Sequence, residues 1–259
     1  MNPEIGALFV QVAYIAASAA FILGLRGLTK PDTARRGMQL AAMGMLLAVI
    51  GTLLNHQIIS YDLIIIGLVI GTAIGLPMGL LVPMTAMPQR IAISHMFGAL
   101  AVTLVGIAEF LHYRDVPGGP GVIKMVALGF ETVFGALTIT GSFMAFGKLQ
   151  GFISGRPITF PGQKIINAAI FVGAIGLWIY LIATQSGGPA ASGDNGILLF
   201  GLMTLLALVI GVTLVLPIGG ADMPVVVSLL NSYAGLAASA TGLALTPGST
   251  GSVKHWREG

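Results

Sequence analysis

The sequence has no cysteine and very little charge. None of its 259 residues is cysteine, which excludes a disulfide framework and thiolate metal or redox centres. Only 8% of the residues are charged, whereas a soluble domain of this length carries roughly a quarter. The formal net charge of +3 therefore gives no indication of nucleic-acid binding, because in a membrane protein the basic residues report orientation instead. The shortage of charge predicts an integral membrane protein.

Long apolar segments take the place of a charged surface. Hydrophobic residues make up 56% of the chain, and charges, Pro and Gly divide them into eight segments of roughly the length that a helix needs to cross a bilayer. None shows the short alternation of a barrel strand. We therefore predict an all-α, polytopic transmembrane helix bundle. The expected spans, good to about four residues, are 5–25, 37–54, 62–82, 91–111, 123–147, 165–184, 196–217 and 223–245.

The basic residues predict the orientation of these spans. Most of them fall in loops on one side of the membrane: Arg26, Lys30, Arg35, Arg36, Arg90, Lys148, Arg156 and Lys164. The opposite loops hold only Arg114 and Lys124. The positive-inside rule then places the Arg/Lys-rich loops in the cytoplasm and the N-terminus outside. The expected location is the inner (cytoplasmic) membrane, crossed several times.

The end of the sequence differs from the rest. We interpret residues 1–245 as one transmembrane domain and residues 246–259, "TPGSTGSVKHWREG", as a polar tail. The tail is rich in Gly and Ser and has no apolar period. Eight spans that start outside also end outside, so we expect a truncation or an artificial addition here and a native chain that continues further.

Familiar soluble-enzyme motifs are missing. No HExxH, GxSxG, P-loop or Rossmann pattern occurs in a usable context, so we expect no metal site and no cofactor bound by this chain. The glycine-rich run "GLVIGTAIGLPMG" places Gly67, Gly71, Gly75 and Gly79 four residues apart. That spacing forms a smooth helix face that a neighbouring helix can approach, rather than a phosphate loop.

Polar residues within the spans are the functional candidates, because ionisable groups are expensive in lipid. His95 lies roughly 8 Å inside the cytoplasmic end and Ser142 roughly 9 Å, while Asn231 lies roughly 13 Å from Asp222, by helix rise. Three polar residues on three helices thus fall at similar depth. Glu131 lies some 16 Å further out than Ser142.

Each candidate also has an ordinary structural interpretation. His95 is either a proton-handling group, since imidazole titrates near neutral pH, or a satisfied core histidine. Asn231 is either part of the site or an interhelical hydrogen bond. Ser142 is either functional or bonded to its own backbone. Glu131 is either a path residue or a group at the outer mouth, and Glu109 is more simply interfacial.

Several motifs carry a resemblance to one family. "GGADMPVVVSLLNSYAGLAASATG" in the last span, "MTAMPQRIAISHMFGALA" around His95 and "ETVFGALTITGSFMAFGKLQG" in the fifth span resemble the beta subunit of proton-translocating NAD(P) transhydrogenases. The resemblance covers nearly the whole chain apart from the tail. It implies that His95, Asn231, Ser142 and Glu131 form the proton path. It also implies that Asp222, together with Arg90, couples the path to the nucleotide domain.

The resemblance also implies what lies outside this chain. Hydride would pass between NADH and NADP in extramembrane domains, so NAD and NADP would be bound by a missing domain or a partner subunit. The expected partners are the alpha subunit, the NADP-binding domain and a second copy of the complex, with the lipid bilayer around them and no nucleic acid. Some members carry acidic residues where this chain has Ala86 and Gln89. A secondary ion transporter and a non-catalytic scaffold remain the alternatives.

Overall fold

Helices are the only regular secondary structure in the part of the chain that the structure describes. The computed structural model describes residues 3–54, 61–114, 119–185 and 194–245, which contain no strand. All eight of their long helices are long and apolar enough to cross a membrane, which confirms the predicted all-α bundle. The tail at 246–259 lies outside the described residues. The helices are α1 Pro3–Gly27, α2 Pro31–Leu53, α3 Asp62–Leu80, α4 Met87–Arg114, α5 Gly121–Gln150, α6 Gln163–Gln185, α7 Asp194–Val215 and α8 Met223–Ala244.

The observed helix ends agree with the predicted spans to within about four residues, except at the start of α2. This helix begins at Pro31 rather than at residue 37. The proline ring fixes the backbone angle that a first helical residue needs, and Lys30 precedes it in an extended conformation. The charges of Arg35 and Arg36 interrupt the apolar pattern, but long basic side chains at a helix end reach the aqueous interface without breaking the helix.

The first of two compact units, residues 1–77, contains the α1–α2 hairpin. Small residues let the two helices approach closely: a Cβ added to Gly37 would lie 2.6 Å from the Gly24 carbonyl oxygen, and one added to Gly44 would lie 3.0 Å from that of Ala17. Such contacts replace hydrophobic burial as the source of helix association in lipid. The Tyr14 hydroxyl also lies 3.0 Å from Thr52 Oγ1 across the hairpin.

The glycine face of α3 is uncovered in the described part of the chain. No neighbouring atom lies within 4 Å of a Cβ placed on Gly67, Gly71, Gly75 or Gly79, and the helix has no buried residue. The expected smooth face is therefore present, without a neighbouring helix against it among the described residues.

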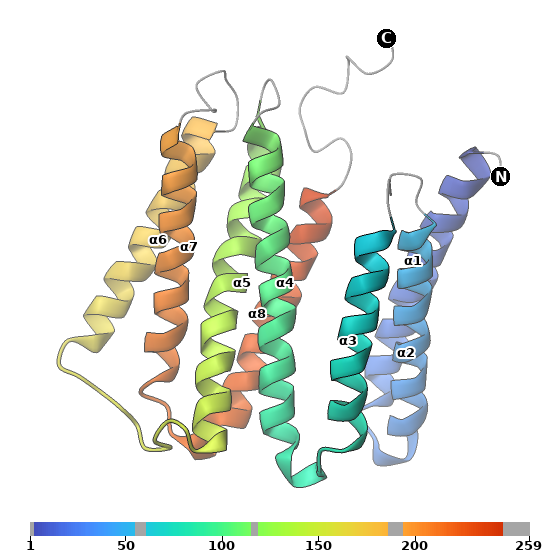
Figure 1. The fold of residues 1–259 in the computed structure, drawn as a ribbon, viewed down its shortest axis with the longest axis horizontal. Coiled ribbons are helices and arrows are strands. Elements are labelled where there is room, and N and C mark those ends of the chain that lie inside the picture. The colour runs from blue at the N-terminus through green and yellow to red at the C-terminus, as the bar shows by residue number, and fades with distance from the viewer. Residues whose placement is uncertain (1–2, 55–60, 115–118, 186–193, 246–259) are drawn as a thin grey trace. The chain divides into compact units, whose positions relative to one another are not determined.

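The second unit begins at Met78 and contains α4 to α8. Its centre is α5, which packs against α4, α6, α7 and α8. About 67% of the apolar stretch of α5 is buried, against at most 33% in any other helix. Figure 1 shows the five helices side by side between the same two ends. We name these the basic end, where α5 ends and α6 begins, and the opposite end, where α4 ends and α5 begins.

Glycines bring other helices against α5. A Cβ at Gly129 of α5 would collide with the Trp178 ring of α6, and a Cβ at Gly141 would lie 3.1 Å from Leu230 of α8. Gly211 of α7 lies directly against the backbone of α5. These contacts fix α5 within its neighbours, so polar side chains on α5 are enclosed by protein rather than lipid.

Candidate functional site

The contact between α4 and α5, called here the α4–α5 seam, runs the length of the bundle. Its register is fixed near both ends, because Gln89 Nε2 donates to the Leu149 carbonyl at 3.3 Å and Lys124 Nζ donates to the Tyr113 hydroxyl at 2.6 Å. The two helices are antiparallel. A step of one residue toward the C-terminus of α4 therefore corresponds to a step of one residue toward the N-terminus of α5.

Midway along the seam, each helix places a glycine opposite polar side chains of the other. A Cβ at Gly106 of α4 would lie 2.5 Å from Glu131 Oε1 and 2.6 Å from Thr132 Oγ1. A Cβ at Gly135 of α5 would collide with Thr103 Oγ1. The seam is therefore both tightly packed and polar, which the apolar composition of the two helices does not suggest.

Glu131 is enclosed completely in this seam. Its side chain is 0% exposed, and neither carboxyl oxygen has a hydrogen bond of good geometry. The Thr241 side chain of α8 interacts with the carboxyl group, but the Thr241 hydroxyl donates to Ala237 O of its own helix at 3.1 Å. A buried carboxyl group without donors is costly as a carboxylate and is a candidate to carry a proton.

His95 lies further toward the basic end on α4. Both ring nitrogens are buried and neither has a hydrogen-bond partner, unlike those of a satisfied core histidine. Thr103 faces Gly135, so the same register, continued by eight residues, brings His95 level with residue 143. His95 therefore lies at the depth of Ser142, which is 1% exposed. The sequence-based estimate of equal depth agrees with this placement.

Asn231 reaches the same depth but a different face. Leu230, its neighbour on α8, packs on Gly141 of α5, so Asn231 is also level with Ser142. The Asn231 side chain itself is exposed, because Leu230 occupies the side of α8 that faces α5. No hydrogen bond joins Asn231 to the ring of His95 among the described residues. Ser228 and Ser232 on the exposed side of α8 line a surface hollow of about 530 Å³.

The two residues expected at the cytoplasmic mouth lie at the basic end. Asp222 is exposed and immediately precedes α8, without capping that helix through its side chain. Arg90 in the first turn of α4 donates from Nη1 to the carbonyl oxygens of Met78 at 3.0 Å and Gly79 at 3.1 Å. Arg90 thus satisfies two carbonyl groups just before the start of α4, and its charge is engaged by backbone.

Lys148 has a role that the sequence did not indicate. We counted it as a loop charge, but its side chain is only 5% exposed. Its ammonium donates to the carbonyl oxygens of Val215, Leu216 and Ile218, at 3.3, 2.5 and 2.7 Å. It thereby satisfies acceptors left free at the end of α7, where a cation is also favoured by the helix dipole.

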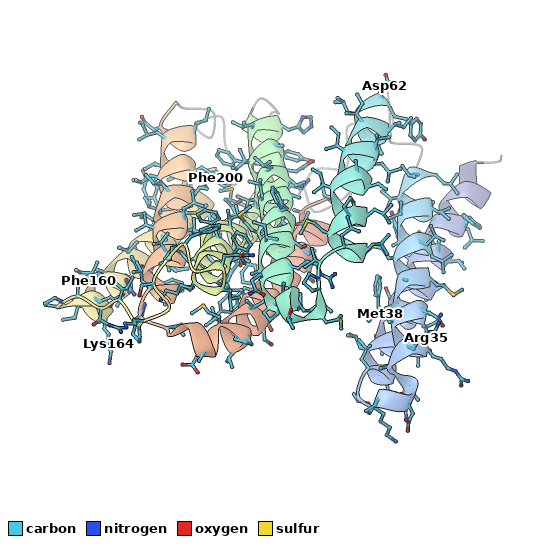
Figure 2. The ribbon with its side chains drawn as sticks, turned by 60° about the horizontal axis from the view of Figure 1, so that its bottom comes forward. Arg35, Met38, Asp62, Phe160, Lys164 and Phe200 are labelled. Atoms are coloured by element: carbon cyan, nitrogen blue, oxygen red, sulfur yellow. The ribbon has the colours of Figure 1, made fainter. Side chains whose placement is uncertain are left out.

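The turn held by Lys148 is also tied to the loop before α6. Ile158 N donates to Leu216 O at 3.1 Å, and Gly220 N donates to Gly155 O at 2.8 Å. Phe160 and Lys164 project outward just beyond this loop (Figure 2). The backbone that carries Asp222 is therefore fixed to α5 and to the 151–162 loop.

We expect Lys148→Met to lower the stability of the protein by about 1.5–3 kcal/mol, since carbonyl groups at the end of α7 lose a charged donor. The measurement is the midpoint of thermal unfolding in detergent. Lys164→Met, at an exposed site on α6, serves as the control and should leave the midpoint unchanged. Equal midpoints for both variants would contradict the assigned role of Lys148.

The sequence also did not indicate that Lys124 is buried in contact with Glu109. Lys124 was counted as a loop charge and Glu109 as interfacial, yet Lys124 Nζ lies 3.8 Å from Glu109 Oε2 with the lysine side chain 3% exposed. A signal was available: Lys124, Glu131 and Thr138 recur at a spacing of seven residues, which places them on one face of a helix.

These features define a class of protein, a multi-pass helical membrane protein with ionisable side chains buried in a helix seam. Among the described residues, no three His, Cys, Asp or Glu side chains lie together as a metal site would require. Comparison with known families matches residues 10–248 to the NAD(P) transhydrogenase beta subunit. The chain belongs to this family.

Curated relatives agree with this assignment. Two proteins from Rhodospirillum rubrum, each named NAD(P) transhydrogenase subunit beta, are 40% identical to the chain over 239 residues. The alignment covers 91% of this chain and 49% of each relative. The chain therefore spans about half the length of the curated relatives that it matches.

Proposed function

We propose that this chain is the proton-conducting membrane part of a proton-translocating NAD(P) transhydrogenase. The observation that carries the proposal is a set of buried polar atoms on α4 and α5: both ring nitrogens of His95 and both carboxyl oxygens of Glu131 are buried without a hydrogen bond of good geometry. Polar groups left unpaired inside protein are costly unless they serve a purpose. Membership in the beta subunit family supplies the reaction with which proton movement is coupled.

His95 is the central group of the proposed path, because an imidazole accepts a proton at one nitrogen and releases it from the other. Ser142, level with it on α5, orients the ring or a water molecule. Asn231 completes the site from α8, and Glu131 receives the proton nearer the opposite end. Asp222 and Arg90 lie at the basic end, where they transmit the state of the path to the nucleotide domain.

The remaining parts of the reaction belong to partners. NAD and NADP bind outside this chain, in the alpha subunit and the NADP-binding domain, and the complex forms a dimer. The chain lies in the cytoplasmic membrane with its N-terminus outside and its basic end in the cytoplasm. The exposed Asn231 supports the presence of partner helices, because an amide facing lipid leaves its hydrogen bonds unsatisfied.

The shape of the helices supports conduction along a fixed seam. Helices α4 to α8 each run unbroken from end to end. Secondary transporters typically place discontinuous helices at the membrane midplane. The described part of the second unit has no such break, so nothing in it favours the ion-transporter alternative.

Replacing Ser142 tests the proposed function at the centre of the seam. Ser142→Val in the complete complex removes the hydroxyl and is expected to slow coupled proton translocation by about three- to tenfold, the equivalent of one hydrogen bond. The measurement uses reconstituted vesicles with an internal pH indicator and hydride transfer assayed in parallel. Ser94→Val is the control, because Ser94 is exposed and donates to Arg90 O of its own helix at 2.8 Å. Unchanged translocation in Ser142→Val would count against the path.

A further inference from the structure

A second polar cluster closes the α4–α5 seam at the opposite end. The ammonium of Lys124 donates to the Tyr113 hydroxyl at 2.6 Å and lies 3.8 Å from the centre of the Tyr113 ring. The same nitrogen lies 3.8 Å from Glu109 Oε2. The Glu109 side chain is 23% exposed and that of Lys124 only 3%. Glu109 is thus the charged group through which this ion pair meets the surroundings.

Glu131 is the next ionisable group inward from this ion pair. It follows Lys124 by seven residues on the same face of α5, a rise of about 10 Å. It lies against Gly106, which is less than one helical turn from Glu109 on α4. The Glu109 and Glu131 carboxyl groups interact electrostatically. Glu109 therefore stands between Lys124 and Glu131, within the influence of both.

Few other groups contribute to the charge of this cluster. His112 of α4 makes an edge contact with the Tyr113 ring, with 5.3 Å between ring centres. From α8 comes the uncharged Thr241, and from α5 itself Thr132. Residues 195–215 of α7 include no ionisable side chain, while on α6 Lys164 lies at the basic end and Tyr180 is exposed.

The charges of the cluster balance only when it holds one proton. With both carboxyl groups ionised, two negative charges face one ammonium, and with both protonated the ammonium is unpaired. Either imbalance is expensive in a buried, low-dielectric site. The contact with Lys124 keeps the negative charge on Glu109. The proton then belongs to Glu131, which has no hydrogen bond of good geometry to stabilise a carboxylate.

We propose that Glu109, Lys124 and Glu131 form a site that loads one proton at the entrance of the α4–α5 seam. Glu131 carries the proton, Glu109 is the partly exposed carboxylate that takes up its replacement, and Lys124 is the positioning residue that fixes which carboxyl group is charged. When the O–H bond of Glu131 breaks and the proton leaves along the seam, the cluster becomes negative. A proton from the aqueous side then restores neutrality. This inference rests on the proposed proton path.

The test counts protonated carboxyl groups in the complete complex at neutral pH. Infrared difference spectra against the wild-type complex report the carbonyl band of a protonated, buried carboxylic acid. Glu131→Gln and Glu109→Gln should each lose one such group, because a single ionised carboxyl group then balances the charge of the Lys124 ammonium. Lys124→Met should gain one, whereas Lys124→Arg should match the wild type. The double variant Glu109→Gln with Lys124→Met should also match it, and this variant removes the ion pair without leaving a buried charge.

Two results would overturn the loading site. One is an undiminished band in Glu109→Gln or no gain in Lys124→Met. The other is proton translocation in vesicles that stays at the wild-type rate in Glu109→Gln and Lys124→Met, where we expect a loss of about tenfold. With either result, the proposed proton path along the seam still stands if Ser142→Val slows translocation. Failure of the Ser142 test instead removes the proposed function on which the loading site rests.

Discussion

Replacing His95 with glutamine in the complete enzyme is expected to reduce coupled proton translocation by at least about 100-fold, the scale of losing a positioned acid–base group. Glutamine keeps a polar side chain of similar length but does not titrate near neutral pH. The ring of His95 has no hydrogen bond to lose, so a large effect would come from proton transfer rather than from a broken structural contact.

The measurement for His95→Gln is proton movement in reconstituted vesicles, with the thermal unfolding midpoint recorded to show that folding is preserved. His112→Gln is the matched control, since His112 is exposed at the opposite end of α4 and makes only the edge contact with Tyr113. If both variants translocated protons at similar rates, His95 would have no place in the path and the core-histidine interpretation would return.

The second prediction with a large expected effect is that replacing Gly211 lowers the stability of the protein. A Cβ at this position in α7 would collide with the Leu137 carbonyl oxygen and with Thr140 Oγ1, and the Gly141 nitrogen would lie 3.0 Å away. Two of these atoms are backbone and cannot rotate aside. Gly211→Ala should therefore destabilise the complex by about 1–3 kcal/mol, as overpacking does.

Gly201, ten residues earlier on the same helix, provides the control for Gly211. No neighbouring atom lies within 4 Å of a Cβ there, so Gly201→Ala should leave stability unchanged or raise it by about 0.5–1 kcal/mol, because alanine favours the helix. Thermal unfolding of the purified complex measures both. A stability of Gly211→Ala equal to that of Gly201→Ala would show that α7 and α5 are not as close as described.

The helices were predictable from sequence because each needs a long apolar run, and such a run can be recognised without any knowledge of tertiary contacts. The depths of His95 and Ser142 were predictable for the same reason, since the helices are continuous and rise is constant. The direction of a side chain was not predictable. Asn231 lies at the expected level but on the exposed side of α8, because Leu230 rather than Asn231 packs on Gly141.

Basic residues near helix ends were the other source of error. Lys124 and Lys148, at the two ends of the expected fifth span, were counted as loop charges when the orientation was predicted. Each is buried nonetheless, Lys124 against Glu109 and Tyr113 and Lys148 against three carbonyl groups. The partners of both lysines lie on other segments of the chain. Such contacts cannot be predicted when each segment of the sequence is considered alone.

The alternation of glycine and polar side chains across the α4–α5 seam restricts which amino-acid substitutions this protein can accept during evolution. Any residue larger than glycine at position 106 takes the space of the Glu131 carboxyl group, and the same holds for position 135 and Thr103. Substitutions there are therefore expected to survive only in pairs. Gly106→Ala combined with Glu131→Asp should be better tolerated than Gly106→Ala alone, because the shorter acid vacates the volume of one methylene group. Positions 106 and 131, and likewise 135 and 103, should thus vary together among relatives.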